Sequence, residues 1–201
     1  MLLGSNAAVT QSFVHLRIHS EFSLADGIVR IPDLIAAAAA DSMPAIALTD
    51  LANLFGAAKF HQAAVGAGIK PINGADLWLA NSSDLNKPFR FTVLCQNTAG
   101  YRNLCRLLTR AFIEGQHTGR PCVQRDWLEQ GADGLIILSG AHEGDVGAAL
   151  LAGQIEQARA LIARYQSCFG DRYYLELQRT GQPRQEDYNH AAVAAASANG
   201  V

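Results

Sequence analysis

Polar side chains near the start of the chain have the types and spacing of a metal site or an acid–base pair. His15, Arg17 and His19 alternate along one short segment, so in an extended conformation all three point to one face. Asp26 follows in the next loop, and together with His19 it could supply two ligands to a divalent metal ion. Two ligands do not make a site, because a hydrogen-bonded histidine and an ordinary turn aspartate explain the same residues.

Further candidate residues follow the segments that we expect to form strands. Short apolar runs alternate with segments of helical periodicity, a pattern typical of βαβ units and a mainly parallel sheet. In a parallel α/β barrel, reactive groups gather at the C-terminal ends of the strands. The positions expected there are Arg17, His19, Asp50, Leu51, Asp76, Asn97 and residues 139–142. We interpret His142 and its neighbour Glu143 as an exposed loop pair, with a substitute role in a site as the alternative.

The predicted elements alternate along the whole chain. The predicted strands are Phe13–Ile18, Ala45–Leu48, Pro71–Leu79, Phe89–Cys95, Gly134–Leu138 and Tyr173–Leu177. The predicted helices are Ile31–Asp41, Phe55–Ala67, Gly100–Ile113, Gln124–Gln130, Val146–Leu151, Ile155–Phe169 and Gln185–Ala198. After the last helix we expect a short loop into another strand, so we predict that the chain is a fragment of a longer polypeptide.

Composition excludes several classes of protein. The 201 residues are 49% hydrophobic and 17% charged, which suits a folded domain with a large core. With 16 basic and 18 acidic residues the formal net charge is -2, which leaves no strong field for sequence-independent DNA binding. The longest apolar stretch, residues 28–40, is interrupted by charged residues, and residues 1–11 lack the pattern of a secretion signal. We therefore predict a cytoplasmic protein with no membrane contact.

Six stretches of the sequence together resemble a known family. They are residues 13–27, 43–50, 68–76, 97–104, 134–140 and 175–177. With these stretches the chain resembles the PHP (polymerase and histidinol phosphatase) domain family, in the form found in the bacterial DNA polymerase III alpha subunit. The resemblance implies an α/β fold, a distorted seven-stranded βα barrel of TIM-like PHP type over residues 13–201, with residues 1–12 as an N-terminal extension. It also implies that the last strand and the polymerase palm, thumb and fingers lie beyond Val201.

Active members of this family hold a trinuclear metal cluster in the mouth of the barrel, and the resemblance assigns ligand positions to this chain. Positions that keep a possible ligand are His19, Asp26 and Asp76. Positions that have lost one are Arg17, Leu51 and Arg90, where the family has histidines, and Ala141, where it has a cysteine. A guanidinium cannot lose its proton and repels a cation, so the resemblance implies a degenerate site with no bound metal and no catalytic residue.

The two arginines need anionic partners if no metal is present. We expect Asp26, Asp50 or Asp76 to neutralise the guanidiniums of Arg17 and Arg90 across the mouth. Asp50 and His142 are both expected to lie at this mouth.

The resemblance implies a role in DNA replication. The favoured interpretation is a catalytically silent structural module that docks the proofreading 3′–5′ exonuclease subunit, within a parent DNA-directed DNA polymerase that uses Mg²⁺ and contacts DNA and the rest of the replicase. One alternative is an active metal-dependent phosphoesterase, a pyrophosphatase or 3′–5′ exonuclease, which would use Zn²⁺ or Mn²⁺ on His19, Asp26 and Asp76. A second alternative is a free-standing phosphatase of the histidinol phosphate type.

Overall fold

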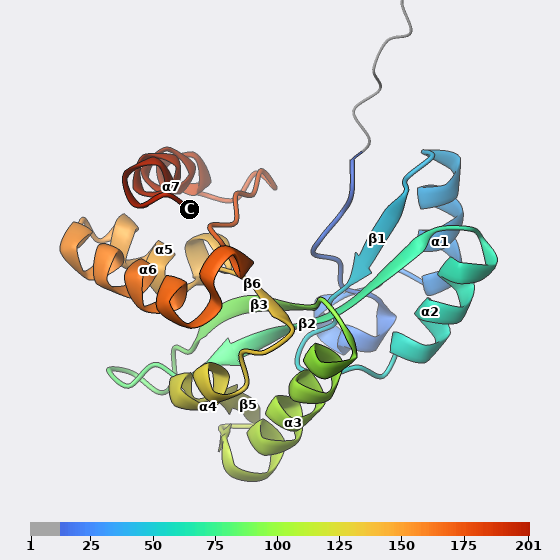
Figure 1. The fold of residues 1–201 in the computed structure, drawn as a ribbon, viewed down its shortest axis with the longest axis horizontal. Coiled ribbons are helices and arrows are strands. Elements are labelled where there is room, and N and C mark those ends of the chain that lie inside the picture. The colour runs from blue at the N-terminus through green and yellow to red at the C-terminus, as the bar shows by residue number, and fades with distance from the viewer. Residues whose placement is uncertain (1–12) are drawn as a thin grey trace, which may run out of the picture.

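One long strand organises the fold in the computed structural model, which describes residues 13–201. Strand β2 (Lys70–Leu79) pairs along its first half with β1 (Ala45–Leu48) in parallel. The second half of β2 pairs with β3 (Phe89–Cys95) in antiparallel, and its last two residues pair with β5 (Arg120–Val123) in parallel. Because β2 contacts three strands, it joins the two parts of the molecule seen in Figure 1.

The remaining strands extend the sheet on both sides. Strand β6 (Leu135–Leu138) lies antiparallel to β3, and β7 (Tyr173–Tyr174) lies parallel to β6. On the other side, β4 (Gln116–His117) pairs with β5 in a hairpin. The order of the sheet is β4-β5-β2-β3-β6-β7, with β1 attached to β2. Within residues 13–201 the seven-stranded sheet is not closed, so the α/β class is confirmed and the expected barrel is not.

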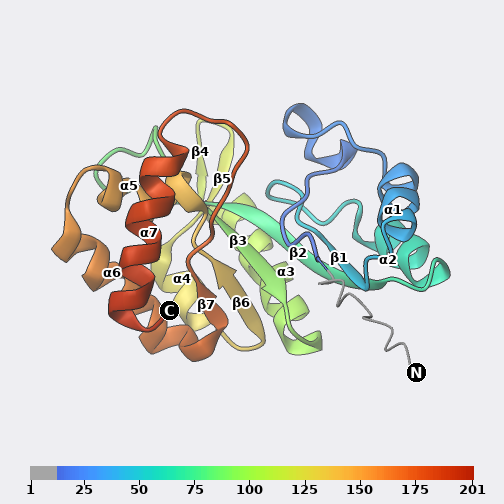
Figure 2. The ribbon, with the colours of Figure 1, turned by 90° about the horizontal axis from the view of Figure 1, so that it is seen from above.

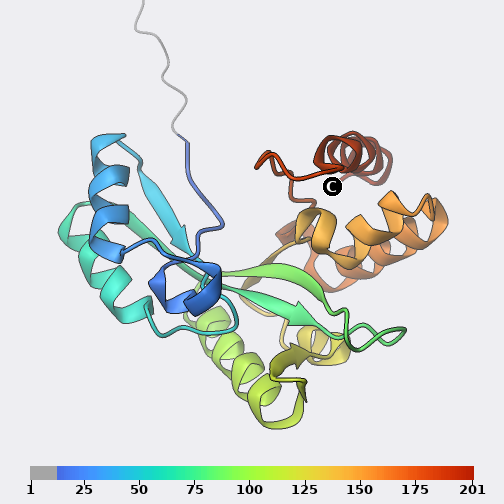
Figure 3. The same ribbon diagram turned by 180° about the vertical axis from the view of Figure 1, so that it is seen from behind.

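Helices cover the sheet in two groups. The helices are α1 (Ile31–Ala40), α2 (Ala57–Gly66), α3 (Thr98–Glu114), α4 (Arg125–Gln130), α5 (Asp145–Leu151), α6 (Ile155–Phe169) and α7 (Gln185–Asn199), with short 3-10 turns η1 (Glu21–Asp26), η2 (Ala141–Glu143) and η3 (Gly170–Arg172). Figure 2 shows α1 and α2 beside β1, and α5, α6 and α7 together at the opposite side. Figure 3 shows the reverse view, in which β2 runs between the two groups. In the part of the chain that the structure describes, no helix is long and apolar enough to cross a bilayer.

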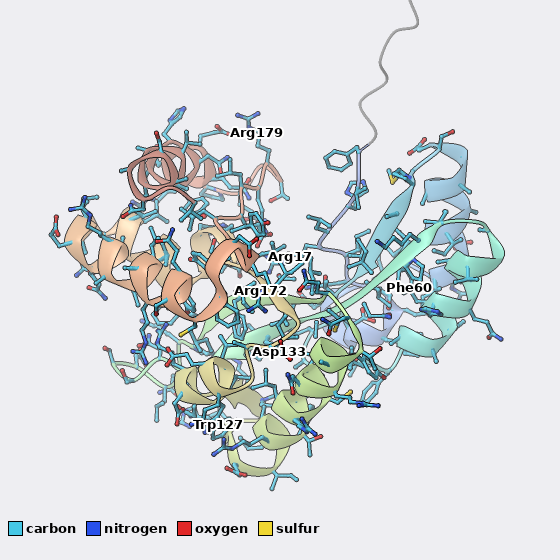
Figure 4. The ribbon with its side chains drawn as sticks, viewed as in Figure 1. Arg17, Phe60, Trp127, Asp133, Arg172 and Arg179 are labelled. Atoms are coloured by element: carbon cyan, nitrogen blue, oxygen red, sulfur yellow. The ribbon has the colours of Figure 1, made fainter. Side chains whose placement is uncertain are left out.

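Each group of helices has its own hydrophobic core. The smaller core lies between α1, α2 and β1 and contains Ile31, Ile46 and the fully buried Phe60, which Figure 4 labels. The larger core lies under α3 to α7 and includes Leu104 and Tyr188. These two cores fix the strands whose ends carry the candidate site.

The predicted helices are confirmed, with every end within two residues of the prediction. The predicted mainly parallel sheet is wrong for β2, β3 and β6, which alternate in direction. Only nine residues, 80–88, connect β2 to β3, whereas a parallel connection needs a dozen or more. A turn in this loop, where the Lys87 N–H donates to the Asp84 carbonyl at 2.9 Å, sends the chain back beside β2.

Two predicted strands are wholly or mostly irregular. Residues 13–18 are extended but form no regular strand. The carbonyl of His15 accepts a 2.9 Å hydrogen bond from Ala47 in β1, and that of Ile18 accepts one of 2.9 Å from Thr49, directly after β1. Of the predicted Tyr173–Leu177, only the first two residues pair. The hairpin of β4 and β5 was not predicted, because two residues are too short to show alternation; Thr118 and Gly119 at its turn both have positive φ. The predicted N-terminal extension, residues 1–12, lies outside the described residues.

Candidate functional site

A single buried carboxylate is the centre of the candidate site. Asp76 on β2 is fully buried, and its Oδ2 is contacted by three side chains. Arg17 approaches this oxygen with Nη2 at 2.6 Å and Nε at 3.1 Å, and Arg90 approaches it with Nη2 at 2.5 Å. His19 Nε2 lies 3.0 Å away, and Thr92 donates to the other oxygen, Oδ1, at 3.3 Å.

Strand geometry places these side chains together. Arg17 and His19 alternate on the extended segment beside β1, so they point to the same side, as the sequence predicts. On the neighbouring strands, Asp76 lies opposite Thr92, and Arg90 is two residues before Thr92 on the same face of β3. In Figure 4, Arg17 projects near the centre of the view, where the two halves of the molecule meet.

The loop after β6 approaches the site closely. A Cβ at Gly140 would lie 2.0 Å from the backbone carbonyl oxygen of Arg90, and Gly140 has a φ of +75°. Only glycine fits both conditions, since a side chain would clash with β3 and strain the turn. The close approach brings Glu143, at the end of this loop, to the mouth of the site.

Three further carboxylates surround the central group. Asp26 Oδ2 contacts His19 Nδ1 at 2.8 Å and Arg90 Nη2 at 3.0 Å. Glu176 Oε1 contacts Arg17 Nη1 at 3.2 Å, and Glu143 lies 3.6 Å from the Arg17 guanidinium and 4.0 Å from that of Arg90. A shallow cavity of about 300 Å³ opens over the cluster; its lining residues are Arg17, His19, Asp26, Arg90, Glu143 and Gln178.

The electrostatics of the cluster keep Asp76 ionised. Burial raises the pKa of the Asp76 carboxyl, but the hydrogen bond from His19 and the positive charges of Arg17 and Arg90 outweigh it, so the pKa lies below its ordinary value. Burial lowers the pKa of the Arg17 guanidinium, but the nearby negative charges of Asp76 and Glu176 raise it by more. The pKa of Arg17 is therefore above its ordinary value. Asp76 and Arg17 are therefore oppositely charged partners at neutral pH.

Asp50 belongs to a separate hydrogen-bond network. Its carboxylate, 1% exposed, accepts bonds from the backbone N–H of Ser20 at 2.6 Å and from the Ser20 and Ser23 hydroxyls at 2.8–2.9 Å. The expected neutralisation of Arg17 and Arg90 by Asp26, Asp50 or Asp76 is confirmed through Asp26 and Asp76, and Asp50 contacts neither arginine in the described part of the chain. Ser20, which caps the turn η1, and Ser23 within the turn supply three neutral donors to Asp50.

The other predicted positions lie around the cluster without joining it. Leu51 forms a parallel bridge with the backbone of Asp76, and Ala141 is completely buried in the larger core. His142 is half-buried, its Nδ1 has no hydrogen-bond partner among the described residues, and it does not line the cavity. Sequence reasoning missed Glu176 as a partner of Arg17. A lone acidic residue between Leu175 and Leu177 at a strand end was the signal that could have identified it.

Comparison with known proteins identifies the family. Residues 15–180 match the family model described as the PHP domain. The chain belongs to the PHP domain family. It is 48% identical over 189 residues to the DNA polymerase III subunit alpha of Pseudomonas aeruginosa and 46% identical over 189 residues to that of Escherichia coli K12. These alignments cover 94% of this chain but only 16% of each relative.

A solved PHP-like structure supports the fold. A protein of Bifidobacterium adolescentis, described as a candidate metal-dependent phosphoesterase, superposes with a TM-score of 0.58 over 94% of this chain and 84% of that protein. The two sequences are only 12% identical, so this likeness concerns the fold alone.

The PHP family implies a metal centre, and the residues present here do not fit one. The Oδ2 of Asp76, which would have to face a metal, already accepts contacts from Arg17, His19 and Arg90. Both guanidiniums are permanently charged and would lie beside the cation. Among residues 13–201, no group of three or more His, Cys, Asp or Glu side chains is placed to hold a metal ion.

Proposed function

We propose that this chain is the N-terminal PHP region of a DNA polymerase III alpha subunit, and that its mouth is a structural centre without phosphoesterase activity. The sequence identity to alpha subunits supports the first part. The single observation that carries the second part is that Arg17 and Arg90 both contact one carboxylate oxygen of Asp76.

The cluster takes over the cross-linking role that a metal has in other proteins. Through Arg17, Asp76 and Arg90 it connects the segment before η1 to β2 and β3. Contacts of Arg17 with Glu176, and of both arginines with Glu143, extend the network to the chain after β7 and the loop after β6. Charges in this position hold the strands in register, because each buried ion left without its partner is strongly destabilising.

The fold supports a further part of the proposal. The sheet of residues 13–201 is open between the extended segment 13–18 and β7. One additional strand in this opening would complete the distorted seven-stranded barrel that the PHP family resemblance implies. The elements η1, β1 and β2 would lie on one side of that strand, and β6 and β7 on the other.

The proposed parent protein defines the partners. An alpha subunit is a DNA-directed DNA polymerase that uses Mg²⁺ at a site outside this chain and contacts DNA there, within the cytoplasmic replicase. This region then has a docking role for the proofreading 3′–5′ exonuclease subunit. The net charge of -2 is consistent with a protein partner for this region, because a DNA-binding surface needs excess positive charge.

A phosphoesterase assay tests the loss of activity. The purified chain is incubated with pyrophosphate, p-nitrophenyl phosphate or a 3′-terminal DNA substrate in Mn²⁺ or Zn²⁺. We expect no hydrolysis above that of the matched Asp76→Asn variant. Metal-dependent turnover that is abolished by Asp76→Asn and retained by the exposed control Asp133→Asn would show an active site instead.

A binding measurement tests the docking role. The chain is mixed with the proofreading exonuclease subunit of the same organism and examined by size-exclusion chromatography with light scattering. We expect a one-to-one complex in which the exonuclease keeps its activity. Separate elution of the two proteins at micromolar concentration would contradict the docking role and leave the structural role of the cluster to be judged by the hydrolysis assay.

A further inference from the structure

A polar groove lies on the outer side of the sheet, away from the ion cluster. Its volume is about 660 Å³, and its lining comes from α2, the start of β2 and the segment 95–101 that leads from β3 into α3. Figures 1 and 3 both show α2 and α3 on the same side of β2. The groove shares no lining residue with the cavity over the cluster, so it is a separate site.

The pleat of β2 separates the two sites. Asp76 lies among the ions of the mouth, whereas Asn73, three residues earlier, lines the groove. Side chains three positions apart on a strand point to opposite faces. The face that carries Asn73 continues into Ala75 and Leu77, which are buried in the larger core. The groove is therefore an uncovered part of the layer between the sheet and its helices.

The sheet offers no free edge at the groove. Strand β2 is paired with β1 through Asn73 and with β3 from Gly74 onward. An occupant of the groove cannot join the sheet as a further strand, so its polar contacts must come from side chains.

The lining contains no charged side chain. None of its eleven residues is an aspartate, glutamate, lysine or arginine, although 17% of the chain is charged. Phosphate groups and nucleic acids need basic residues. A metal ion needs several carboxylate, thiolate or imidazole ligands, and the lining offers only His61 and Cys95. The groove therefore suits a neutral ligand that carries hydrogen-bonding groups.

Three side-chain amides supply the hydrogen-bonding groups of the groove. Gln62 on α2 and Gln96 before α3 are exposed, and Asn73 on β2 is half-buried. A fourth amide, Asn97, is already occupied, because its Oδ1 accepts from the Gly100 N–H at 3.0 Å and caps α3. A side-chain amide carries both a donor and an acceptor, as a peptide unit does. The three amides can therefore bond to a peptide backbone whatever side chains that peptide carries.

Asn73 indicates what the occupant must donate. Its Oδ1 is buried and has no hydrogen-bond partner among the described residues. A buried acceptor without a donor is costly. Because Asn73 lines the groove, a rotation of its side chain brings this oxygen within reach of an N–H in the groove. The backbone N–H of a bound peptide is such a donor.

We propose that the groove binds a short extended peptide segment of another protein through its backbone, with an N–H donating to Asn73 and carbonyls accepting from Gln62 and Gln96. An extended chain presents its donors and acceptors alternately to the two helices beside the groove. Pro71 and Tyr101, which is 40% exposed, supply apolar contacts for its side chains.

The polarity of the groove favours a separate partner as the source of the peptide. Exposed amides such as those of Gln62 and Gln96 are hydrated when the groove is empty, so the fold does not need the occupant. This suits a partner that binds and dissociates. The binding is independent of the proposed function, because the groove contains no residue of the ion cluster.

Titration with capped peptides tests recognition of the backbone. The purified chain is titrated with an acetylated and amidated tetrapeptide of alanine, and the ¹H–¹⁵N NMR signals of the side-chain amides are recorded. We expect saturable shifts of the Gln62, Asn73 and Gln96 amide signals. The same peptide built from N-methylated alanines lacks those N–H donors and is the matched probe. It should bind about tenfold more weakly.

Variants test whether the groove is the binding site. Asn73→Leu removes an amide at similar volume and should weaken binding of the alanine peptide about tenfold. Gln130→Leu, at the exposed end of α4 and outside the groove, is the control and should leave binding unchanged. Melting temperatures show whether both variants are folded. If Asn73→Leu does not fold, Gln62→Leu on the exposed surface of α2 replaces it, with the same expected direction.

Several results would overturn the proposal. They are the absence of saturable shifts, shifts confined to amides outside the groove, equal binding of the two peptides, and unchanged binding by the groove variants.

Saturation-transfer NMR on the full-length alpha subunit tests the source of the peptide. We expect the alanine peptide to bind the full-length protein as it binds the chain. Binding to the chain alone would mean that a segment of the same polypeptide fills the groove, which contradicts a separate partner. None of these measurements involves phosphoesterase activity, so failure here is distinct from failure of the proposed function.

Discussion

Two buried aspartates lie close together in this fold and are stabilised in opposite ways. Asp76 is contacted by two guanidiniums and an imidazole. Asp50 instead accepts hydrogen bonds from the hydroxyl groups of Ser20 and Ser23 and from the backbone N–H of Ser20. Both are at most 1% exposed. Asp76 thus depends on charges from distant parts of the chain, and Asp50 depends on a local turn.

The difference shows what the two sites can do. A carboxylate surrounded by neutral donors keeps its negative charge uncompensated within its network, whereas the charge of Asp76 is compensated by Arg17 and Arg90. We therefore expect the Asp76 cluster to bind no added cation, and we propose that its energetic role is to connect strands. Variants that remove each carboxylate separately can test this comparison.

The largest effect is expected for Asp76→Asn. The amide removes the charge that neutralises Arg17 and Arg90, whose side chains are only 14% and 10% exposed. Breaking a buried pair from one side costs about 3–5 kcal/mol. Urea denaturation should show a loss of this size in the free energy of unfolding, compared with less than about 0.5 kcal/mol for the exposed control Asp133→Asn. A loss below about 1 kcal/mol for Asp76→Asn would mean that the cluster does not hold the strands together.

A smaller loss is expected for Asp50→Asn. The amide keeps one acceptor for Ser20 and Ser23, but its NH₂ group faces donors instead of acceptors. Removing hydrogen bonds of this kind from a buried group costs about 1–3 kcal/mol. Thermal and urea denaturation should place this variant between Asp76→Asn and the wild type. If Asp50→Asn were the more damaging of the two, the local turn would be the principal support of the site.

Acid should remove the contribution of Asp76 selectively. Its pKa is lower in the folded state than in the unfolded state, so its stabilisation is fully present above the ordinary carboxyl pKa of about 4 and is lost as the pH falls through the folded-state pKa. The difference in unfolding free energy between wild type and Asp76→Asn should be constant from pH 7 to about 5 and should narrow below about pH 4. A difference that widens on acidification would contradict the sign of this linkage.

The smallest effect is expected for Glu143→Gln. Its side chain is 41% exposed, and it lies 3.6 Å and 4.0 Å from the two guanidiniums. Exposed pairs of this length contribute no more than about 1 kcal/mol. Urea denaturation should therefore show a loss below this limit, and a loss comparable to that of Asp76→Asn would mean that Glu143 is an essential part of the cluster.

Local features of the fold were predictable from the sequence, and long-range pairings were not. Helix α6 was predicted without error in its ends, because its periodicity and the following Gly170 are local signals. The sequence pattern of Phe89–Cys95 is the same for parallel and antiparallel pairing, so only the short connection of nine residues after β2 indicated the direction of β3. The closure of the sheet likewise depends on contacts that no short segment specifies.

The same distinction applies to the candidate site. Pairing of Arg17 and Arg90 with Asp76 could be predicted, since buried guanidiniums require carboxylates. The capture of Asp50 by Ser20 and Ser23 could not, because it depends on the path of the turn η1. The acidic Glu176 between two leucines was a local signal for a buried carboxylate, but its pairing with Arg17 joins residues 159 positions apart, which no local pattern specifies.

The measurement that tests the central claim most directly is isothermal titration of the purified chain with Mn²⁺ and with Zn²⁺ at neutral pH. If the mouth is a closed network of ion pairs, neither metal should bind stoichiometrically, and the wild type and Asp76→Asn should give the same heats as buffer. Binding of one or more equivalents of metal that is lost in Asp76→Asn would show that the mouth is a metal centre and would contradict the account.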